Sequence, residues 1–275
     1  MEPKDRVGYD SGGGVQLEVS LAWAAQHGLH AVDFNAERAV NLLTTWSDQR
    51  VRAVRETCER HDLHLGLHTS SGVNTAEFAP FVAPSIDEYL RASIDFGKRL
   101  GCDWIVVHAG FHFSSQLPQR MQAARDRLQR ATDHAEQAGV QLVLENLNHE
   151  PDDAEVHYLA HNVEECRYFF DAIQSPHLGW AFTVNHAHLV PEGIDGFFEA
   201  FGAARLGEVR LADNRGDKEQ HLLLGQGTID FPSIFGKLEA AGYRGPYTMN
   251  YGAVDDMLRD RDYFAAMVKN PPKWR

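Results

Sequence analysis

The sequence predicts an α/β fold, a (β/α)8 TIM barrel formed as a single domain. Short apolar runs alternate with amphipathic helical stretches along the whole chain, which is typical of parallel β/α architecture. Runs such as WIVVHAG and VQLVLEN are almost continuously apolar until a polar residue near the end, as expected of strands buried on both faces. No linker or change in composition divides the chain, so we expect one domain over residues 1–275, a length that such barrels reach.

Eight strands are expected where these apolar runs occur. In chain order they are Val7–Asp10, His30–Phe34, Leu63–Thr69, Trp104–Ala109, Val140–Asn146, Leu178–Val184, Gly207–Ala212 and Tyr247–Tyr251. Parallel strands joined by right-handed crossovers can close into a barrel. A doubly wound sheet of six or seven strands is the alternative, and we disfavour it because no dinucleotide or phosphate glycine motif follows the first strand.

Helices are expected in the amphipathic stretches between the strands. They cover residues 15–27, 43–61, 85–100, 116–138, 162–173, 194–203, 231–242 and 254–268. Four glycines, Gly28, Gly101, Gly139 and Gly242, each lie between a helix and a strand. A residue with positive φ commonly ends a helix at such a position, which supports these boundaries.

The bulk composition indicates a soluble globular protein. Hydrophobic residues make up 43% and charged residues 24%, and no run approaches the ~20 apolar residues of a membrane span. The N-terminus resembles neither a signal peptide nor a transit peptide, so we expect a cytoplasmic location and no membrane partner. The formal net charge of −13 disfavours nucleic acid as a partner. Cys58, Cys102 and Cys166 are too few and too widely spaced for a disulfide framework, so we expect free thiols.

Polar residues gather where the predicted strands end, which is the end at which barrel enzymes build their sites. His68 ends the third strand, His108 the fourth and Glu145 the fifth. Further candidates at other strand ends are Asp33, Asn35, Thr183, Asn185, His186, His188, Arg210, Asp213, Glu219, His221 and Asn250. Several imidazoles with a carboxylate would burden a barrel core unless they bind a metal or a substrate, so we expect an active site there.

The most specific segments are HAG after the fourth strand, LEN in the fifth, NHAH after the sixth and LADNRGDKEQHLLLGQGTIDF after the seventh. On these segments the chain resembles the xylose-isomerase-like superfamily. That superfamily includes sugar isomerases, sugar and keto-sugar epimerases, inosose dehydratases and class II apurinic endonucleases. The resemblance covers nearly the whole chain, and it implies the fold more specifically than any substrate.

The resemblance also implies a metal site from which this sequence departs. Isomerases of the family hold one divalent metal with a Glu on strand five, an Asp on strand six, a His on strand seven and a Glu on strand eight. Glu145 matches the first position, but Thr183, Arg210 and Asn250 stand at the other three. A hydroxyl, a permanent cation and an amide do not replace two carboxylates and an imidazole, so we expect this usual site to be absent.

Two other groups resemble zinc ligands of the endonuclease branch. They are His68, His108 and Glu145, and His186, Glu219 and His221, in which a Glu stands for an Asp. Either group could hold one divalent ion, zinc or manganese, with open coordination positions. The alternative, favoured here because Arg210 would repel a dication, is that no cofactor is bound and these side chains contact a sugar, polyol or sugar acid.

Arg210 has two interpretations that do not exclude each other. Its guanidinium can bind a carboxylate, phosphate or enediolate oxygen in place of the metal. It can also form a salt bridge to Glu145 or Asp213 that fills the vacated metal position.

The chemistry that the resemblance implies is proton removal beside a carbonyl, which gives an enediolate. We assign Glu145 as the proton acceptor or its orienter, His186 or His221 as a second acid or base, and Arg210 as the oxyanion stabiliser. Substrate-orienting roles are expected for His68, His108, Asn185, His188, Asp213, Asn250, Asp33 and Asn35. The predicted function is therefore that of a sugar or keto-sugar isomerase or epimerase.

Two other functions stay open at this point. One is a metal-dependent lyase or hydrolase in which a His/Glu group activates water. The other is a non-catalytic binding or accessory subunit that kept its pocket. The expected partner is a small molecule, and homo-oligomerisation is left open.

Overall fold

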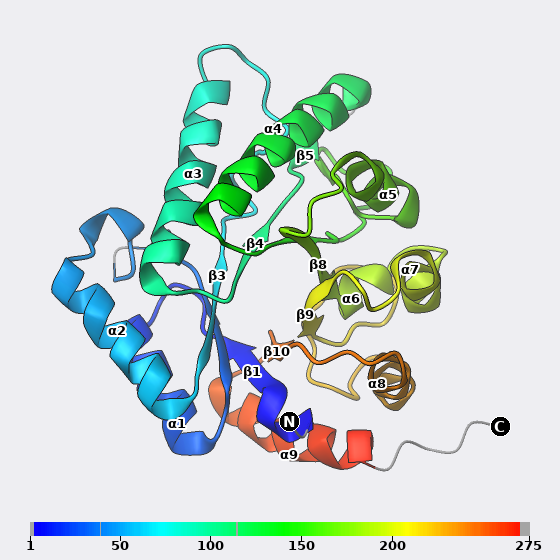
Figure 1. The fold of residues 1–275 in the computed structure, drawn as a ribbon. Coiled ribbons are helices and arrows are strands. Elements are labelled where there is room, and N and C mark those ends of the chain that lie inside the picture. The colour runs from blue at the N-terminus through cyan, green and yellow to red at the C-terminus, as the bar shows by residue number, and fades with distance from the viewer. Residues whose placement is uncertain (1–2, 39, 114, 270–275) are drawn as a thin grey trace.

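Eight parallel strands close into a barrel in the computed structural model, which describes residues 3–38, 40–113 and 115–269 (Figure 1). The barrel strands are β1 (Val7–Asp10), β2 (Ala31–Phe34), β3 (His64–His68), β4 (Trp104–Val107), β6 (Leu142–Glu145), β8 (Leu178–Thr183), β9 (Leu206–Leu211) and β10 (Tyr247–Met249). Parallel pairing of β1 with β10 closes the sheet. The predicted (β/α)8 barrel is confirmed, and the doubly wound alternative is wrong.

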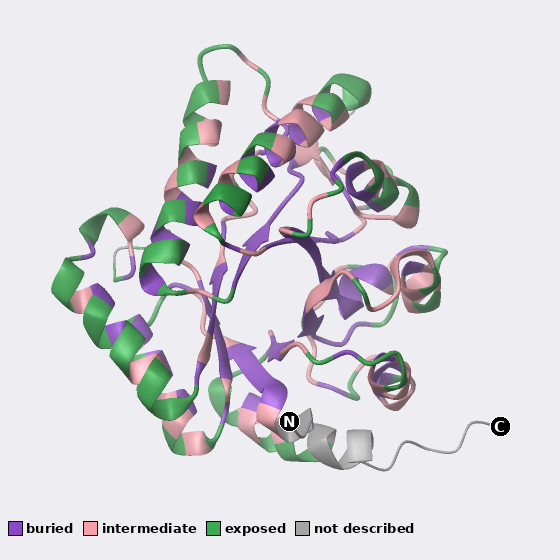
Figure 2. Cartoon of the chain, viewed as in Figure 1, coloured by how far each residue is buried: buried purple, intermediate pink, exposed green. Residues whose placement is uncertain are grey.

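Helices surround the barrel and cover its outer face (Figure 1). They are α1 (Leu17–His27), α2 (Asp48–His61), α3 (Ala83–Leu100), α4 (Leu117–Ala138), α5 (Val163–Ala172), α6 (Val184–Ala187), α7 (Gly193–Phe201), α8 (Phe231–Ala240) and α9 (Val254–Lys269), with short 3-10 turns η1 (Pro3–Arg6) and η2 (Leu43–Thr45). Figure 2 shows the buried faces of these helices turned toward the strands and the exposed faces turned outward. This division follows from the amphipathic pattern of the helical stretches.

The glycines predicted at helix ends adopt the left-handed conformation. Gly28, Gly101 and Gly139 end α1, α3 and α4 with φ of 67°, 78° and 71°. Gly242 has a φ of 83° and follows Ala241, which ends α8. A side chain is strained at such φ values, which explains why glycine stands there.

Most barrel strands are one or two residues shorter at one or both ends than predicted, and local structure differs from the predictions elsewhere too. The helix expected over 43–61 is broken, because Trp46 is extended and Ser47 caps a new helix by accepting the N–H of Arg50. The sixth predicted strand is one residue too long, since Val184 already belongs to α6. An unpredicted two-stranded antiparallel sheet joins β5 (Phe111–His112) to β7 (His157–Tyr158), in loops that follow β4 and β6.

The inside of the barrel changes from apolar to polar along the strands. Ala31, Trp104 and Val143 belong to a small buried cluster separate from the main core. Residues two positions apart share a strand face, so Asp33 and Glu145 follow Ala31 and Val143 on the same faces. The carboxyl ends of the strands therefore carry the polar side chains, as expected of a barrel active site.

The state of the cysteines and the character of the helices bear on two predictions made from the composition. Cys58, Cys102 and Cys166 are free thiols. In the described part of the chain, no helix combines the length and apolar composition needed to cross a bilayer.

Gly66 of β3 is expected to tolerate no side chain. A Cβ placed on it would lie 2.3 Å from the Trp104 ring and 2.5 Å from Asp33 Oδ1. We predict that Gly66→Ala lowers the free energy of unfolding by about 1–3 kcal/mol through overpacking. Urea unfolding followed by circular dichroism measures this change.

Gly14 supplies the matched control. A Cβ there would meet only the Arg38 guanidinium, at 3.9 Å, and the residue is exposed. Gly14→Ala should change stability by less than about 0.5 kcal/mol. Equal unfolding midpoints for the two alanine variants would contradict the packing account.

Candidate functional site

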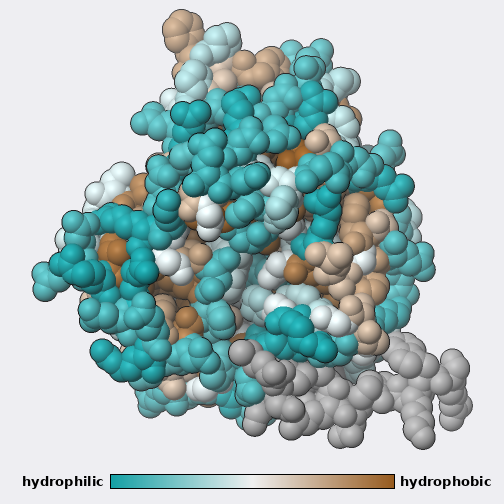
Figure 3. Space-filling model, in the orientation of Figure 1, coloured by the Kyte–Doolittle hydropathy of each residue, from teal (hydrophilic) through white to brown (hydrophobic). Residues whose placement is uncertain are grey.

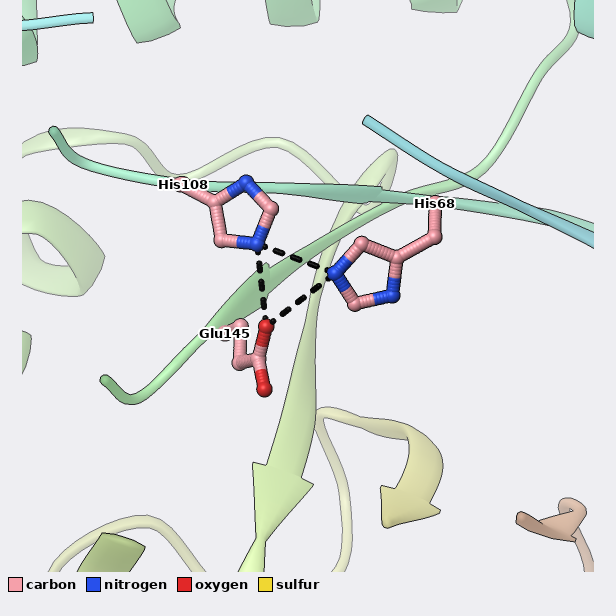
Figure 4. A group of neighbouring side chains, drawn as sticks. All are labelled: His68, His108 and Glu145. Atoms are coloured by element: carbon pink, nitrogen blue, oxygen red, sulfur yellow. Dashed lines mark hydrogen bonds and ion pairs between the residues drawn. The ribbon is translucent and has the colours of Figure 1, made fainter. Parts of the chain in front are cut away.

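His68, His108 and Glu145 converge at the carboxyl ends of three barrel strands (Figure 4). His68 is the last residue of β3, His108 follows β4 directly, and Glu145 is the last residue of β6. His108 Nε2 lies 3.0 Å from Glu145 Oε2 and 3.1 Å from His68 Nε2. His68 Nε2 lies 3.5 Å from the same carboxylate oxygen, so three ligand atoms face one point. The structure brings this predicted group together.

The far side of each imidazole in this group faces a hydrogen-bond partner. His68 Nδ1 lies 3.2 Å from Asp33 Oδ2, and His108 Nδ1 lies 3.4 Å from the Thr69 hydroxyl. Because a carboxylate only accepts, His68 carries a proton on Nδ1 and keeps a lone pair on Nε2 when the ring is neutral. Such a carboxylate–imidazole contact is usual behind a metal-binding histidine.

Glu145 is a carboxylate at neutral pH despite its burial. Burial alone raises the pKa of this carboxyl, but the hydrogen bond with His108 and the charges of Arg210 and His68 hold the pKa well below its ordinary value. The Thr183 hydroxyl donates to Glu145 Oε1 at 2.5 Å. Glu145 is therefore an ionised group held in one orientation.

A second group, His186, Glu219 and His221, forms after the next two strands. His186 lies on α6, directly after β8, and the other two residues lie in the loop after β9. Glu219 Oε1 is 3.3 Å from His186 Nε2 and 2.8 Å from His221 Nε2. Asn185 Nδ2 donates to the same oxygen at 2.9 Å, so this predicted residue joins the group.

Backbone carbonyls fix both histidines of the second group. His186 Nδ1 lies 2.8 Å from the carbonyl oxygen of Asn146, and His221 Nδ1 lies 2.6 Å from that of Asn250. Each ring donates from Nδ1 and turns Nε2 toward Glu219. Burial alone raises the pKa of Glu219, but the hydrogen bonds from His186 and His221 lower this pKa to about 2.

His186 connects the two groups. Its Nδ1 lies 3.8 Å from Glu145 Oε1, while its Nε2 faces Glu219. The two carboxylates therefore lie on either side of one imidazole, within a single continuous polar cluster.

Arg210 forms a buried ion-pair network inside the barrel. Its side chain is 1% exposed, with Nη1 paired to Asp33 and, at 3.2 Å, to Glu208, and Nη2 paired to Asp10 at 2.7 Å. Nε lies 3.7 Å from Glu145 Oε1. These contacts match the salt-bridge interpretation, because both terminal nitrogens are already bound to carboxylates.

Of the two salt-bridge partners predicted for Arg210, Glu145 lies 3.7 Å from Nε, whereas Asp213 is not paired with the guanidinium. The Asp213 carboxylate is fully buried and accepts three backbone N–H bonds from the loop that follows it. Asp213 therefore shapes the loop that carries Glu219 and His221, a role set by its position at the start of that loop.

The usual metal site of the family isomerases does not fit this chain. Thr183 and Arg210 are paired in register on β8 and β9, and Asn250 follows β10. The Arg210 guanidinium and its carboxylates fill this part of the barrel. The four-ligand set is therefore replaced by an internal ion pair.

The network nevertheless holds more negative than positive charge. Asp10, Asp33, Glu145 and Glu208 all have an oxygen within 4 Å of one guanidinium. Burial, followed by the charge of Asp33, raises the pKa of Glu208 to about 7. This surplus of carboxylates offsets the repulsion that Arg210 would exert on a neighbouring dication.

Both His/Glu groups have the donors for a divalent metal. Each brings two imidazole nitrogens and one carboxylate oxygen together. Tetrahedral zinc with bonds of about 2.0–2.1 Å separates its ligand atoms by roughly 3.3 Å. The 3.0–3.5 Å separations in the His68, His108 and Glu145 group are close to that value.

Two predicted substrate-orienting residues point elsewhere. Asn35 donates to the backbone carbonyl of His68 at 3.2 Å and so supports that strand end. His188 Nε2 lies 2.9 Å from the Thr228 hydroxyl, in the loop before α8. Neither side chain belongs to the two His/Glu groups.

Asp10 and Glu208 are the charged residues of the site that the sequence reasoning missed. Glu208 stands two residues before Arg210 on one strand, so period-two alternation puts both side chains on the same face. Asp10 ends the first strand, and the rule used for the other strand ends applies to it equally. Both signals were present in the sequence.

A cavity of about 290 Å³ lies at the opposite end of the barrel, lined by Arg6, Trp104, Gly207 and neighbouring residues. None of the site residues predicted from the sequence lines this cavity. The amino ends of barrel strands mainly serve stability, so the candidate site remains at the carboxyl ends.

Glu208→Gln tests the charge of the buried network. The pKa of Glu208 is about 7 in the folded chain against an ordinary 4.5, so between these values only the folded state keeps the proton. Because the folded state holds this extra proton, the contribution of Glu208 to the free energy of unfolding of the wild type falls as the pH rises from about 5 to about 8. We expect the variant to gain about 1–3 kcal/mol relative to the wild type over that interval, measured by urea unfolding at both pH values. The same pH dependence in both proteins would refute this account.

The chain is similar to several known proteins over most of its length. An L-ribulose 3-epimerase of Methylomonas sp. (strain DH-1) is 26% identical over 236 residues, which cover 83% of this chain and 76% of that protein. An uncharacterized protein of Methanocaldococcus jannaschii is 24% identical over 252 residues, 90% of this chain and 83% of that protein. The solved structure of a D-tagatose 3-epimerase-like protein superposes with a TM-score of 0.84 at 22% identity, covering 96% of this chain and 98% of that one.

The family model described as a xylose isomerase-like TIM barrel matches residues 21–267. This match runs from within α1 into α9 and includes seven of the eight barrel strands and both His/Glu groups. The chain belongs to the xylose isomerase-like TIM barrel family.

Proposed function

We propose that the protein is a sugar isomerase or epimerase that moves a proton at the carbon beside the carbonyl of a neutral keto-sugar. The observation that carries the proposal is the ionised carboxylate of Glu145, held between imidazoles at the carboxyl end of the barrel. Two similar proteins, an L-ribulose 3-epimerase and a D-tagatose 3-epimerase-like protein, carry the names of ketose epimerases.

Glu145 is the proposed proton acceptor. Deprotonation beside a carbonyl leaves an enediolate, and a base positioned at that carbon lowers the barrier. The Thr183 hydroxyl and His108 fix the carboxylate from two sides. The Nε2 atom of His68 faces the same point, where its lone pair can accept a hydroxyl of a sugar, whereas His108 Nε2 donates to Glu145.

The second His/Glu group is the proposed source of the returning proton. Inversion at carbon requires reprotonation from the face opposite to the base. His186 lies between Glu145 and Glu219. His221 Nδ1 contacts the backbone carbonyl of Asn250, which follows β10. The Asn250 amide, at the end of β10, cannot donate or accept the proton in catalysis. We therefore assign proton return to His186 or His221.

The charge of the site favours a neutral substrate. Both terminal nitrogens of Arg210 are bound by Asp10, Asp33 and Glu208, so the guanidinium is not open to a substrate anion. The surrounding carboxylates would repel a sugar acid or a sugar phosphate. We therefore favour a neutral keto-sugar over the acidic substrates that Arg210 suggested in the sequence. Arg210 acts as the counter-charge of the buried carboxylates and not as an oxyanion stabiliser.

Metal binding is compatible with this proposal. His68, His108 and Glu145, or His186, Glu219 and His221, would hold one zinc or manganese ion. When bound, such an ion supplies Lewis-acid polarisation of the substrate carbonyl.

Glu145→Gln tests the proposed base. The amide keeps the size of the side chain and cannot accept the proton, so we expect turnover to fall by about a thousandfold or more. The measurement is the incorporation of solvent deuterium beside the carbonyl of ketopentoses and ketohexoses, followed by NMR. Glu59→Gln, an exposed carboxylate on α2, is the control and should keep full activity. Retained exchange in Glu145→Gln, with its fold intact, would reject this assignment.

Elemental analysis after dialysis without chelator tests the metal. We expect about one divalent ion per chain, because one occupied His/Glu group supplies three ligands and the carboxylates around Arg210 offset its repulsion of a dication. His68→Ala with His108→Ala removes one group, and His186→Ala with His221→Ala removes the other. Loss of the ion from only one pair identifies the group that binds it, and a metal-free wild type would contradict the prediction.

A metal-dependent lyase or hydrolase is the second candidate function. The observation that favours it is the His186, Glu219 and His221 group, whose Nε2 atoms both turn to one carboxylate oxygen. A metal there would activate water. Product release from the same sugars without deuterium exchange would distinguish this activity from epimerisation.

A further inference from the structure

Asn146 lies directly after Glu145, and its side chain faces away from the candidate active site. Successive residues of a strand point to opposite faces, so the residue beside the inward-facing Glu145 points outward. The Asn146 side chain accordingly meets the indole of Trp180, which stacks against Phe197 of α7 on the outer side of the sheet. Asn146 is fully buried there. Any influence of its side chain on a substrate inside the barrel must therefore act through other residues.

The surroundings of this side chain are apolar. Trp180 and Phe182 of β8 stack on Phe197, with ring centroids 6.2 Å and 6.4 Å away. In Figure 3, hydrophobic residues gather among hydrophilic ones on the side of the molecule where α5 and α7 lie in Figure 1. A buried carboxamide costs free energy in such a layer unless its donors and acceptors find partners. Asn146 must therefore find its partners among the polar groups of β8.

The carboxamide of Asn146 binds both polar groups of the Thr183 backbone. Its Oδ1 atom accepts the Thr183 N–H at 3.0 Å and the Trp180 indole N–H at 3.1 Å. Its Nδ2 atom donates to the Thr183 carbonyl at 3.0 Å. Thr183 is the last residue of β8, and α6 begins at the next residue. The side chain therefore acts as a further peptide group at the point where the chain leaves the sheet.

Thr183 passes this constraint to both sides of the proposed proton path. Its hydroxyl donates to Glu145 Oε1 at 2.5 Å, so a fixed Thr183 fixes the carboxylate. Its backbone leads directly into α6, a helix of four residues that carries His186. The backbone carbonyl of Asn146 also accepts the N–H of His186 Nδ1 at 2.8 Å. One residue on the outer face of the sheet therefore orients two groups on the inner face.

The proposed proton movement needs these two groups in place at the same time. Glu145 accepts a proton as the C–H bond breaks, and a second group supplies a proton to the opposite face of the carbon as the new C–H bond forms. His186 Nδ1 lies 3.8 Å from Glu145 Oε1, which puts this ring beside the base. Misplacement of a reacting group by about 1 Å can lower a rate by about a hundredfold. The separation of Glu145 and His186 is therefore a requirement of the chemistry.

We propose that Asn146 is the positioning residue that holds Glu145 and His186 in register, and that it thereby decides the fate of the enediolate. With both groups held, His186 protonates the opposite face and the carbon is inverted. With His186 displaced, Glu145 returns its proton to the original face and the starting sugar is regenerated. Solvent restores the protons of both groups after each turnover. The chemistry of this inference rests on the proposed function, whereas the contacts of Asn146 do not.

The partition of solvent deuterium tests this role. Protein as purified is given ketopentoses and ketohexoses in D2O, and NMR measures deuterium beside the carbonyl of the recovered sugar and of its epimer. Asn146→Ala removes the three side-chain hydrogen bonds, and we expect epimer formation to fall by about a hundredfold. Exchange into the recovered sugar should fall less, so that the ratio of exchange to epimerisation rises by about tenfold or more. An unchanged ratio would overturn the proposal.

Asn41→Ala is the matched control. Asn41 is also fully buried, accepts the backbone N–H of Leu17 at 3.0 Å and donates to the Val15 carbonyl at 2.7 Å, at the start of α1. Its loss should lower the urea midpoint, as the loss of Asn146 does, because buried backbone groups lose their partners in both variants. The ratio should stay at the wild-type value. An equal rise of the ratio in both variants would assign the effect to general loosening and refute a positioning role.

Asn146→Leu is the second variant for this position. Leucine keeps the volume of asparagine and suits the apolar layer, but it forms none of the three hydrogen bonds. It should raise the ratio as Asn146→Ala does, and it replaces that variant if the alanine protein does not fold. Failure of both variants to fold would make Asn146 a residue of the fold alone and overturn the proposal.

A spectroscopic signal separates this inference from the proposed function. In protein labelled with 15N-histidine, the hydrogen bond from His186 Nδ1 to the Asn146 carbonyl should protect the Nδ1 proton from rapid exchange in the wild type and in Asn41→Ala. His186→Ala assigns the signal, and folded Asn146→Ala should lose it. If the wild type exchanges deuterium with no ketose, the proposed function fails and this signal still decides the positioning role. A protected Nδ1 proton that persists in Asn146→Ala would overturn it.

Discussion

The buried ion pairs of Arg210 are the constraint on which the rest of the site depends. A guanidinium is stable inside a barrel only when carboxylates surround it, since an unpaired buried charge is strongly destabilising. Asp10, Asp33 and Glu208 meet this requirement and tie together the interior faces of β1, β2 and β9. The interior of the barrel is therefore organised by a side chain of the protein itself.

Asp33 carries the influence of this network into the candidate active site. Its Oδ2 atom pairs with Arg210 and also lies 3.2 Å from His68 Nδ1. The carboxylate thereby fixes the orientation and tautomer of His68, whose Nε2 faces His108 and Glu145. A change in the charge of the interior would thus reach His68 through Asp33, and it would reach Glu145 directly from Arg210.

Backbone contacts position the second His/Glu group in a different way. The Asn146 side chain accepts the Trp180 indole N–H and the Thr183 backbone N–H, which fastens β6 to β8, and its carbonyl orients His186. Asp213 fixes the loop of Glu219 through three backbone N–H groups. Several polar residues that the sequence suggested as site residues therefore position the histidines and carboxylates of the site instead. Their contacts, and not their residue types, distinguish the two roles.

The sequence by itself determined the barrel, its eight strands and the strand ends at which polar side chains collect, because hydrophobic periodicity and strand-terminal polarity are local properties. It also predicted that His68, His108 and Glu145, and likewise His186, Glu219 and His221, form two groups. Tertiary structure alone decided the partners of Arg210. Asp10 lies 200 residues before it in the chain, and Asp213, only three residues after it, turns to the backbone of its own loop. Which carboxylate reaches a buried cation depends on closure of the barrel, since β1 and β9 are brought to either side of β10 only when the sheet closes.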